Sequence, residues 1–142
     1  MAHIKPDDFD KVLAVNVTAN YRLLRSPDLL LRQSDAGRAV FVSSGAARSA
    51  RPFWGLYAAS KAALDALVKS YAGEVATTKV RANVFYPGIV RTAMRAKAMP
   101  GEDPNTLPMP AEIVPLLIDM LSPALTENGR LFNVGTGAFE NI

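Results

Sequence analysis

The sequence has 142 residues, about the size of one ordinary domain, and its 49% hydrophobic and 20% charged residues exclude a disordered chain. The net charge is +3, and the basic residues are scattered without aromatic interleaving, so we expect no nucleic-acid partner. The chain has no cysteine, which excludes disulfides and thiolate metal sites and fits a reducing cytoplasm. No stretch is apolar for long enough to predict a membrane span, and the first residues lack the apolar centre of a signal peptide.

The first predicted element is a long helix that begins near residues 5–8, where acidic side chains favour a helix N-terminus. Apolar residues follow it at helical spacing as far as Leu24. Ser26-Pro27 then interrupts the pattern. Serine before proline is typical of an N-cap followed by the first helical position, so we expect a kink or a restart that ends at Asp35-Ala-Gly37.

The central part of the chain predicts a buried strand, a loop and a second long helix. Residues 38–44 are rich in β-branched and aromatic side chains, residues 45–55 contain two glycines, and residues 56–77 carry an apolar stripe at helical spacing. Five alanines between Ala58 and Ala66 form a flat surface beside that stripe. Such a surface permits close approach of another helix, from this chain or from a second subunit.

The last part predicts a strand over residues 80–86 that is stopped by Pro87-Gly88. A connection without clear periodicity covers residues 91–110. It precedes a helix over residues 110–121, a strand over residues 129–134, and a tail that begins with Gly135-Thr-Gly137. The alternation of helices and strands indicates one α/β layer domain with a parallel sheet.

Tyr57, Lys61 and Ser44 are the residues with a clear chemical interpretation. Tyr57 and Lys61 are four residues apart on one helix, so their side chains share a face. A nearby ammonium stabilises a phenolate and lowers the phenol's pKa from its ordinary value near 10. Ser44 ends the preceding strand, at the edge of an open α/β sheet where ligands bind. The alternative is an amphipathic helix with a packed tyrosine and a solvated lysine.

Five segments, in this order along the chain, resemble the short-chain dehydrogenase/reductase family and cover nearly the whole sequence. They are Val-Asn16-Val, the strand that ends in Ser43-Ser44, Tyr57-Ala-Ala-Ser60-Lys61, the strand and turn from Val80 to Thr92, and the last strand from Gly129 to Val134. The resemblance implies an α/β fold, namely the C-terminal half of a Rossmann-like three-layer α/β/α domain with parallel strands. Residues 1–142 would form a single partial domain of this kind.

The resemblance also implies catalytic roles. Tyr57 would be the general acid/base on an alcohol or carbonyl oxygen, and Lys61 would lower its pKa and bind the nicotinamide ribose. Ser44 would orient the substrate oxygen, while Ser43 would support the strand end. Asn16 would hold a water in a proton relay to Lys61, although its amide could instead satisfy a kink in the first helix.

The implied cofactor is NAD or NADP, bound by Tyr57 and Lys61 together with the turn from Pro87 to Thr92. Pro87 and Gly88 would shape the turn, Ile89 would offer backbone groups to the carboxamide, and Thr92 would offer a hydroxyl to the carboxamide or the phosphates. Simple strand termination is the other interpretation of Pro87-Gly88. Residues 93–109 fall at the family's substrate lid, where methionines suit an adaptable pocket; a mobile loop without a binding role is the alternative.

The sequence departs from the family in one large respect. The family's glycine-rich phosphate loop and its Asn-Asn-Ala-Gly segment have no match, and Gly135-x-Gly137 opens no predicted helix. We therefore expect a C-terminal portion of a longer enzyme, with weak or no dinucleotide binding by this chain alone. The strand over residues 38–44 would then have an open edge that invites pairing or aggregation.

Two functions remain open. The first is an NAD(P)-dependent oxidoreductase that acts on a small carbonyl or alcohol substrate in the cytoplasm. The second is a non-catalytic remnant that serves as a binding or oligomerisation module. The resemblance also implies a homo-oligomer built on the helices around residues 7–33 and 56–77.

Overall fold

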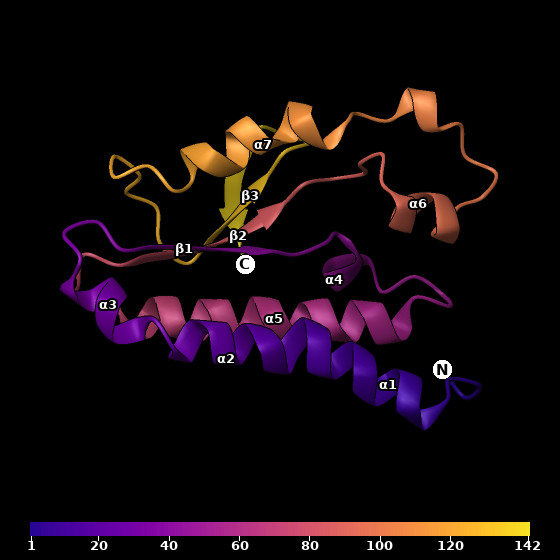
Figure 1. Cartoon of the computed structure of the whole chain (residues 1–142), viewed down its shortest axis with the longest axis horizontal. Helices are drawn as coiled ribbons and strands as arrows, with labels where there is room; N and C mark the ends of the chain where they lie inside the picture. Colours follow the sequence, from indigo (N-terminus) through magenta and orange to yellow (C-terminus); the bar gives the residue numbers. More distant parts are fainter.

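The computed structural model describes all of residues 1–142 and shows a four-stranded sheet between two layers of helices (Figure 1). None of its helices combines the length and the apolarity that crossing a membrane requires. The elements in chain order are α1 (Pro6–Leu13), the π-helical turn η1 (Ala14–Thr18), α2 (Ala19–Arg25), α3 (Asp28–Gln33), β1 (Arg38–Val42), α4 (Ala46–Ser49), α5 (Gly55–Glu74), β2 (Arg81–Tyr86), α6 (Ala93–Ala98), the 3-10 turn η2 (Pro104–Thr106), α7 (Pro110–Asp119), β3 (Arg130–Asn133) and β4 (Ala138–Asn141).

The sheet has the order β1-β2-β3-β4, and its first three strands are parallel. The inner strand β2 is buried from Ala82 to Phe85, which explains why it reads as a continuous apolar run. The predicted α/β class with helices on both faces is confirmed. The tail adds a strand that the sequence does not predict, β4, which pairs with β3 antiparallel.

The hairpin that adds β4 depends on the turn after β3. Gly137 adopts a left-handed φ of +65°, and the Asn133 side chain accepts a hydrogen bond of 2.9 Å from the backbone N–H of Gly135. The glycines at 135 and 137 therefore form a turn between two strands. The expectation that they begin an irregular tail is corrected.

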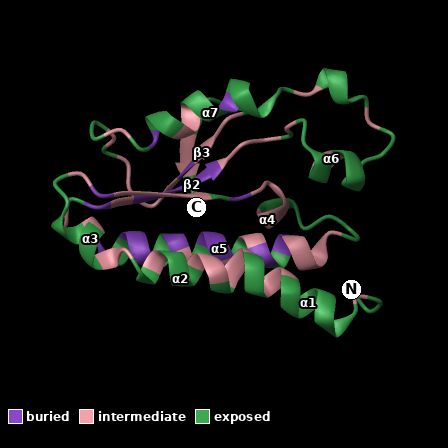
Figure 2. Cartoon of the chain, viewed as in Figure 1, coloured by how far each residue is buried: buried purple, intermediate pink, exposed green.

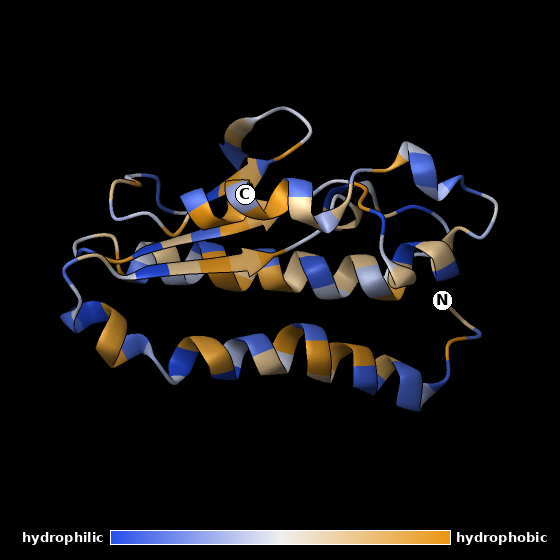
Figure 3. Cartoon of the chain, turned by 45° about the horizontal axis from the view of Figure 1, so that its top comes forward, coloured by the Kyte–Doolittle hydropathy of each residue, from blue (hydrophilic) through white to orange (hydrophobic).

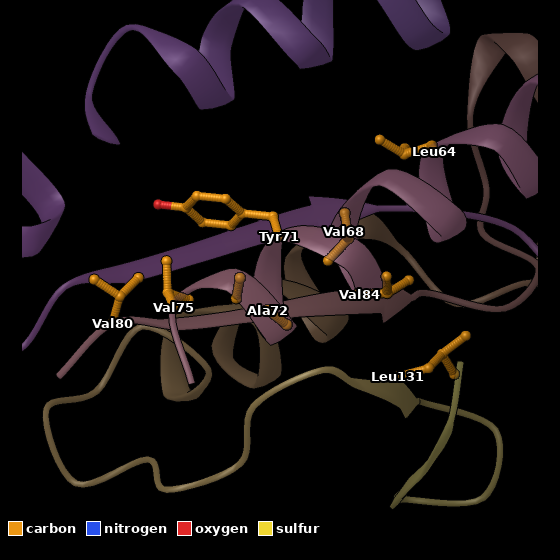
Figure 4. Close-up of a cluster of buried hydrophobic side chains, with 9 residues drawn as sticks. Leu64, Val68, Tyr71, Ala72, Val75, Val80, Val84 and Leu131 are labelled. Carbon is orange, nitrogen blue, oxygen red and sulfur yellow. The ribbon is translucent and has the colours of Figure 1, made fainter. Parts of the chain in front are cut away.

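The larger core lies between α5 and the sheet. Leu64 and Val68 of α5 pack there with Val84 of β2. Val75, just after α5, and Val80, just before β2, join them, and all five are at most 1% exposed (Figure 4). Burial of each such side chain stabilises the fold by about 1.5–3 kcal/mol. This core fixes α5, which carries Tyr57 and Lys61, against the sheet.

A smaller core covers the opposite face of the sheet, where α7 packs (Figure 1). Phe85 of β2 and Ile113 of α7 are buried there, and Met120 after α7 joins them. The rings of Phe85 and Phe132 stack with centroids 6.2 Å apart. The two cores together give the three layers.

The N-terminal helical arm, residues 6–33, lies along α5 and contributes no fully buried residue (Figures 1 and 2). The long predicted helix is present but contains the π-helical turn η1. Ser26 does not act as the N-cap of the restarted helix. Its hydroxyl donates to the carbonyl of Arg22, so it ends α2, and Pro27 precedes α3 as its cap.

The two predicted loops each contain short helices. Residues 45–55 include α4, and residues 91–110 include α6 and η2. Single turns of this length have too few residues for a periodic pattern, and local caps define them instead. The Thr92 hydroxyl accepts a hydrogen bond of 3.1 Å from the backbone N–H of Arg95, which starts α6.

Candidate active site

The predicted site residues gather at the carboxyl ends of the parallel strands. β1 ends at Val42, two residues earlier than predicted, and Ser43 and Ser44 follow it. The backbone N–H of Ser43 donates to the carbonyl of Phe85 at 2.9 Å, which keeps the ends of β1 and β2 together. Tyr57 lies in the first turn of α5.

Tyr57 and Lys61 are neighbours across one turn of α5. The Lys61 Nζ lies 5.9 Å from the centroid of the Tyr57 ring and donates a hydrogen bond of 3.0 Å to the carbonyl of Val42. Trp54 packs edge-on against the same ring, with centroids 6.1 Å apart. The phenol ring therefore has an aromatic wall on one side and an ammonium close by.

Burial lowers the pKa of the Lys61 ammonium, and the negative charge of Asp65 opposes that shift. Burial raises the pKa of Asp65, which lies one helical turn beyond Lys61. Three neighbours lower the pKa of the same carboxyl group, namely the Ser43 hydroxyl and the positive charges of Arg48 and Lys61. The site thus contains a half-buried cation with one acidic neighbour.

Ser44 has its hydroxyl oriented by the loop that follows it. Its Oγ accepts a hydrogen bond of 3.2 Å from the backbone N–H of Ala46. Gly45 is needed here for space, because a Cβ atom at that position would collide with the Tyr86 hydroxyl. The Ser44 hydroxyl donates no hydrogen bond of its own in this arrangement.

Asn16 contacts the site through Ser60 and has no direct contact with Lys61. Its Nδ2 donates to the Ser60 Oγ at 3.0 Å, and that hydroxyl donates to the carbonyl of Tyr57 at 2.8 Å. The Asn16 carbonyl lies in the π-helical turn and accepts a hydrogen bond of 2.9 Å from Asn20. The irregular helix is therefore satisfied by the Asn20 side chain, whereas the Asn16 amide bonds across to α5, and its relay role stays a prediction.

The turn after β2 has an open surface. Gly88 adopts a φ of +75°, nothing lies within 4 Å of where its Cβ would be, and Ile89 is 49% exposed. Pro87 and Gly88 do end the strand, so strand termination is confirmed. The roles of Pro87, Gly88, Ile89 and Thr92 in cofactor binding stay predictions.

An open pocket of about 210 Å³ lies at the predicted lid, and Arg91 and Thr92, which precede the lid, line part of it. Arg95 closes one side of it by donating two hydrogen bonds of 2.6 Å to Glu102. The remaining lining residues are Ala96, Met99, Pro100, Pro104 and Leu107. Of the methionines in the predicted lid, Met99 alone lines this pocket.

Sequence reasoning missed two charged residues near the site, Asp65 and Arg48, and the linking role of Ser60. Asp65 was detectable, because it lies four residues after Lys61 and shares its helix face. Arg48 was not, because it reaches the site from α4, which no sequence pattern predicts.

Comparison with known proteins identifies the family. The family model described as short chain dehydrogenase matches residues 1–103, more than half of the chain. The chain belongs to this family. The oxidoreductase YciK of Escherichia coli K12, whose function is uncharacterised, is 43% identical over 118 residues, or 83% of the chain and 46% of YciK. A chloroplastic NADPH-dependent aldehyde reductase-like protein of Arabidopsis thaliana is 35% identical over 94 residues, or 66% of the chain and 35% of that protein.

Solved structures of the family agree with the fold. A short chain dehydrogenase from Salmonella enterica serovar Typhi superimposes with a TM-score of 0.89 at 38% identity, over 94% of this chain and 55% of that one. A second, from Escherichia coli CFT073, was solved in complex with NADPH and gives a TM-score of 0.88 at 40% identity, over 94% of this chain and 55% of that one. The chain thus spans between about a third and just over half of the length of these relatives.

Proposed function

We propose that the chain is the catalytic portion of an NAD(P)(H)-dependent oxidoreductase that interconverts a carbonyl and an alcohol. One observation carries the proposal: Lys61 Nζ lies 5.9 Å from the Tyr57 ring centroid, at the strand end that presents the Ser44 hydroxyl. The printed names of relatives are consistent with carbonyl reduction. They include 3-oxoacyl-[acyl-carrier-protein] reductases of Rickettsia species and the Arabidopsis aldehyde reductase-like protein.

In the direction of reduction, Ser44 and Tyr57 bind the carbonyl oxygen of the substrate through their hydroxyl groups. The bound nicotinamide supplies the hydride that reaches the carbonyl carbon. Tyr57 gives its phenolic proton to the oxygen, which becomes the alcohol hydroxyl, and is left as a phenolate. The Lys61 ammonium, which lies over the Tyr57 ring, stabilises the negative charge of that phenolate. In oxidation, the phenolate takes the proton back.

The residues present fit the nicotinamide end of the cofactor better than its phosphates. The open turn at Gly88 and Ile89 leaves room for a flat ring, and Lys61 could reach the ribose if it exchanged its bond to Val42. No glycine-rich turn leads into a helix N-terminus, where a pyrophosphate would bind. We therefore expect NADH and NADPH to bind this chain only weakly, and micromolar affinity in a fluorescence titration would contradict that.

The test of the proposal is the substitution Tyr57→Phe in a longer form of the protein, which also contains the part of the relatives that this chain does not cover. Loss of the phenolic proton should lower kcat by about 100-fold or more, the size expected for a general acid. Tyr21→Phe is the matched control, since Tyr21 is exposed on α2. Equal activity of Tyr57→Phe and the unaltered enzyme would exclude the proposed chemistry.

A binding or oligomerisation module is the second candidate, and exposed apolar side chains on the N-terminal arm favour it. Leu23, Leu29 and Leu30 are each more than 65% exposed. If this is the function, Tyr57→Phe has no effect, while polar substitution of these leucines abolishes association.

A further inference from the structure

Two buried polar atoms beside Lys61 have no hydrogen-bond partner. Ser43 is 3% exposed and Asp65 is 8% exposed, and neither the Ser43 Oγ nor the Asp65 Oδ1 makes a hydrogen bond. Leaving a buried polar atom unpaired costs about 1–3 kcal/mol. Two such atoms side by side therefore need an explanation beyond packing.

Their placement connects them to the candidate catalytic pair. Asp65 lies four residues after Lys61, so the two side chains share one face of α5. Lys61 is bonded to the carbonyl of Val42, and Ser43 is the next residue along the chain. The Ser43 hydroxyl lowers the pKa of the Asp65 carboxyl, although the two groups lie outside hydrogen-bond geometry. The end of β1 and the face of α5 thus enclose one polar cluster.

The charges around this cluster are few. Asp65 is the one charged group that raises the pKa of Lys61, whereas burial lowers it. The positive charge of Arg48 on α4 lowers the pKa of Asp65. The guanidinium of Arg48 also donates hydrogen bonds to the Glu140 carboxylate at 2.7 Å and to the carbonyl of Asn141. No charged group from α1, η1 or β2, which also pack on α5, acts on the pKa of either residue.

We propose that Asp65 is a positioning residue, whose carboxylate lies beside the Ser43 hydroxyl and holds the Lys61 side chain charged and directed along the face that carries Tyr57. The carboxylate offsets the cost of removing the ammonium from water. Arg48 in turn keeps the carboxylate ionised. The inference rests on the proposed function only for its last step, the consequence for Tyr57.

The test measures Lys61 directly and needs no turnover. Lysine labelled with ¹³C at Cε is incorporated into the 142-residue chain, and Lys61→Arg identifies the resonance of Lys61. In Asp65→Asn, we expect the pKa of Lys61 to fall by about one unit, because a nearby opposite charge has been removed. Glu74→Gln is the matched control, as Glu74 is an exposed acid on the same helix.

Two further measurements keep the test decisive if Asp65→Asn does not fold. In the unaltered chain, the Lys61 resonance should show a second inflection at the pH where the Asp65 carboxyl titrates. In Ser43→Ala, the pKa of Asp65 should rise, because the hydroxyl that favours the carboxylate is gone. A Lys61 titration that shows neither the fall in Asp65→Asn nor the inflection overturns the inference.

The outcome is separate from that of the proposed reaction. Coupling between Asp65 and Lys61 together with an indifferent Tyr57→Phe would support the positioning role and refute the oxidoreductase. If Tyr57→Phe abolished activity and Asp65 showed no coupling to Lys61, the oxidoreductase proposal would stand and the positioning role of Asp65 would be refuted.

Discussion

Two tyrosines on α5 have opposite electrostatic surroundings. Tyr57 has the Lys61 ammonium 5.9 Å from its ring, whereas the Tyr71 hydroxyl donates a hydrogen bond of 2.7 Å to the Asp28 carboxylate. Burial and that bond to Asp28 raise the pKa of Tyr71 to about 12. A neighbouring cation suits a tyrosine to proton transfer, and a neighbouring anion suits it to a structural bond. The two tyrosines of α5 therefore differ in the charge of their ionisable neighbour.

The bond between Tyr71 and Asp28 ties α3 to α5 and should depend on pH. The Tyr71 hydroxyl is the largest cause that lowers the pKa of Asp28, with Arg32 helping it. Since the folded pKa of Asp28 is lowered, its contribution is present above its ordinary pKa and is lost as the pH falls through the folded value. Since the folded pKa of Tyr71 is raised, its contribution is present below pH 10 and is lost as the pH rises towards about 12.

We predict that Tyr71→Phe lowers the free energy of unfolding by about 1 kcal/mol at neutral pH, the net value of one hydrogen bond. The difference should shrink in acid, where Asp28 is protonated. Urea denaturation at pH 7 and in acid measures both effects. Tyr21→Phe, on exposed α2, is the control and should leave stability unchanged. A Tyr71→Phe effect that is constant with pH would contradict the role of the carboxylate.

At the scale of elements, the side-chain amides of Asn83 and Asn128 join β2 to the segment that leads into β3. The Asn83 Nδ2 donates to the carbonyl of Glu127 at 2.8 Å, and its Oδ1 accepts from the N–H of Arg130 at 2.9 Å. The backbone N–H of Ala82 donates to the Asn128 Oδ1 at 2.9 Å, and the Asn128 Nδ2 donates to the carbonyl of Ala72 at 2.8 Å. These bonds satisfy backbone groups just before the parallel ladder of β2 and β3 begins, so they fix its register.

We predict that Asn83→Leu destabilises the fold by about 2–3 kcal/mol, because it leaves the partners of a 1% exposed amide unpaired. Thermal denaturation followed by circular dichroism would measure the loss. Asn105→Leu is the control, since Asn105 is exposed on η2 and its side-chain amide makes no hydrogen bond. Equal effects of the two substitutions would show that the amide network contributes little.

At the scale of the whole molecule, the outer edge of β1 carries no strand (Figure 3). A shallow, mainly apolar depression without room for a water molecule is lined by Tyr21 and Leu24 of α2, Phe41 of β1 and Leu67 of α5. An unpaired edge beside apolar surface promotes pairing with another chain. The exposed Ala59, Ala62 and Ala66 on α5 offer a second, flat surface, so the predicted homo-oligomer has two candidate contacts.

We predict that the chain self-associates in solution and that Val42→Lys weakens this association by placing a charge at the edge of β1. Sedimentation velocity over a range of concentrations measures the effect. Val114→Lys on α7 is matched in exposure, at 46% against 48% for Val42, and should change nothing. A monodisperse monomer of the unaltered chain would contradict the prediction.

The sequence by itself determined the α/β class, the long helices and the central strands, because their periodic patterns extend over many residues. It also placed Tyr57, Lys61 and Ser44 together, since helical spacing and the end of a strand are local properties. The Asn16 contact to Ser60, by contrast, joins residues 44 positions apart. Such a contact depends on how the N-terminal arm packs on α5.

Only the tertiary structure decided the antiparallel β4, the short helices α4 and α6, and the cluster of Ser43, Asp65 and Arg48. β4 depends on a turn held by a side chain, and α4 and α6 have too few residues to show a period. The cluster combines α4, α5 and the end of β1, so its electrostatics arise only when these elements meet. Burial, which acts against the Lys61 charge, is likewise a property of the packed chain and has no signal in the order of residues.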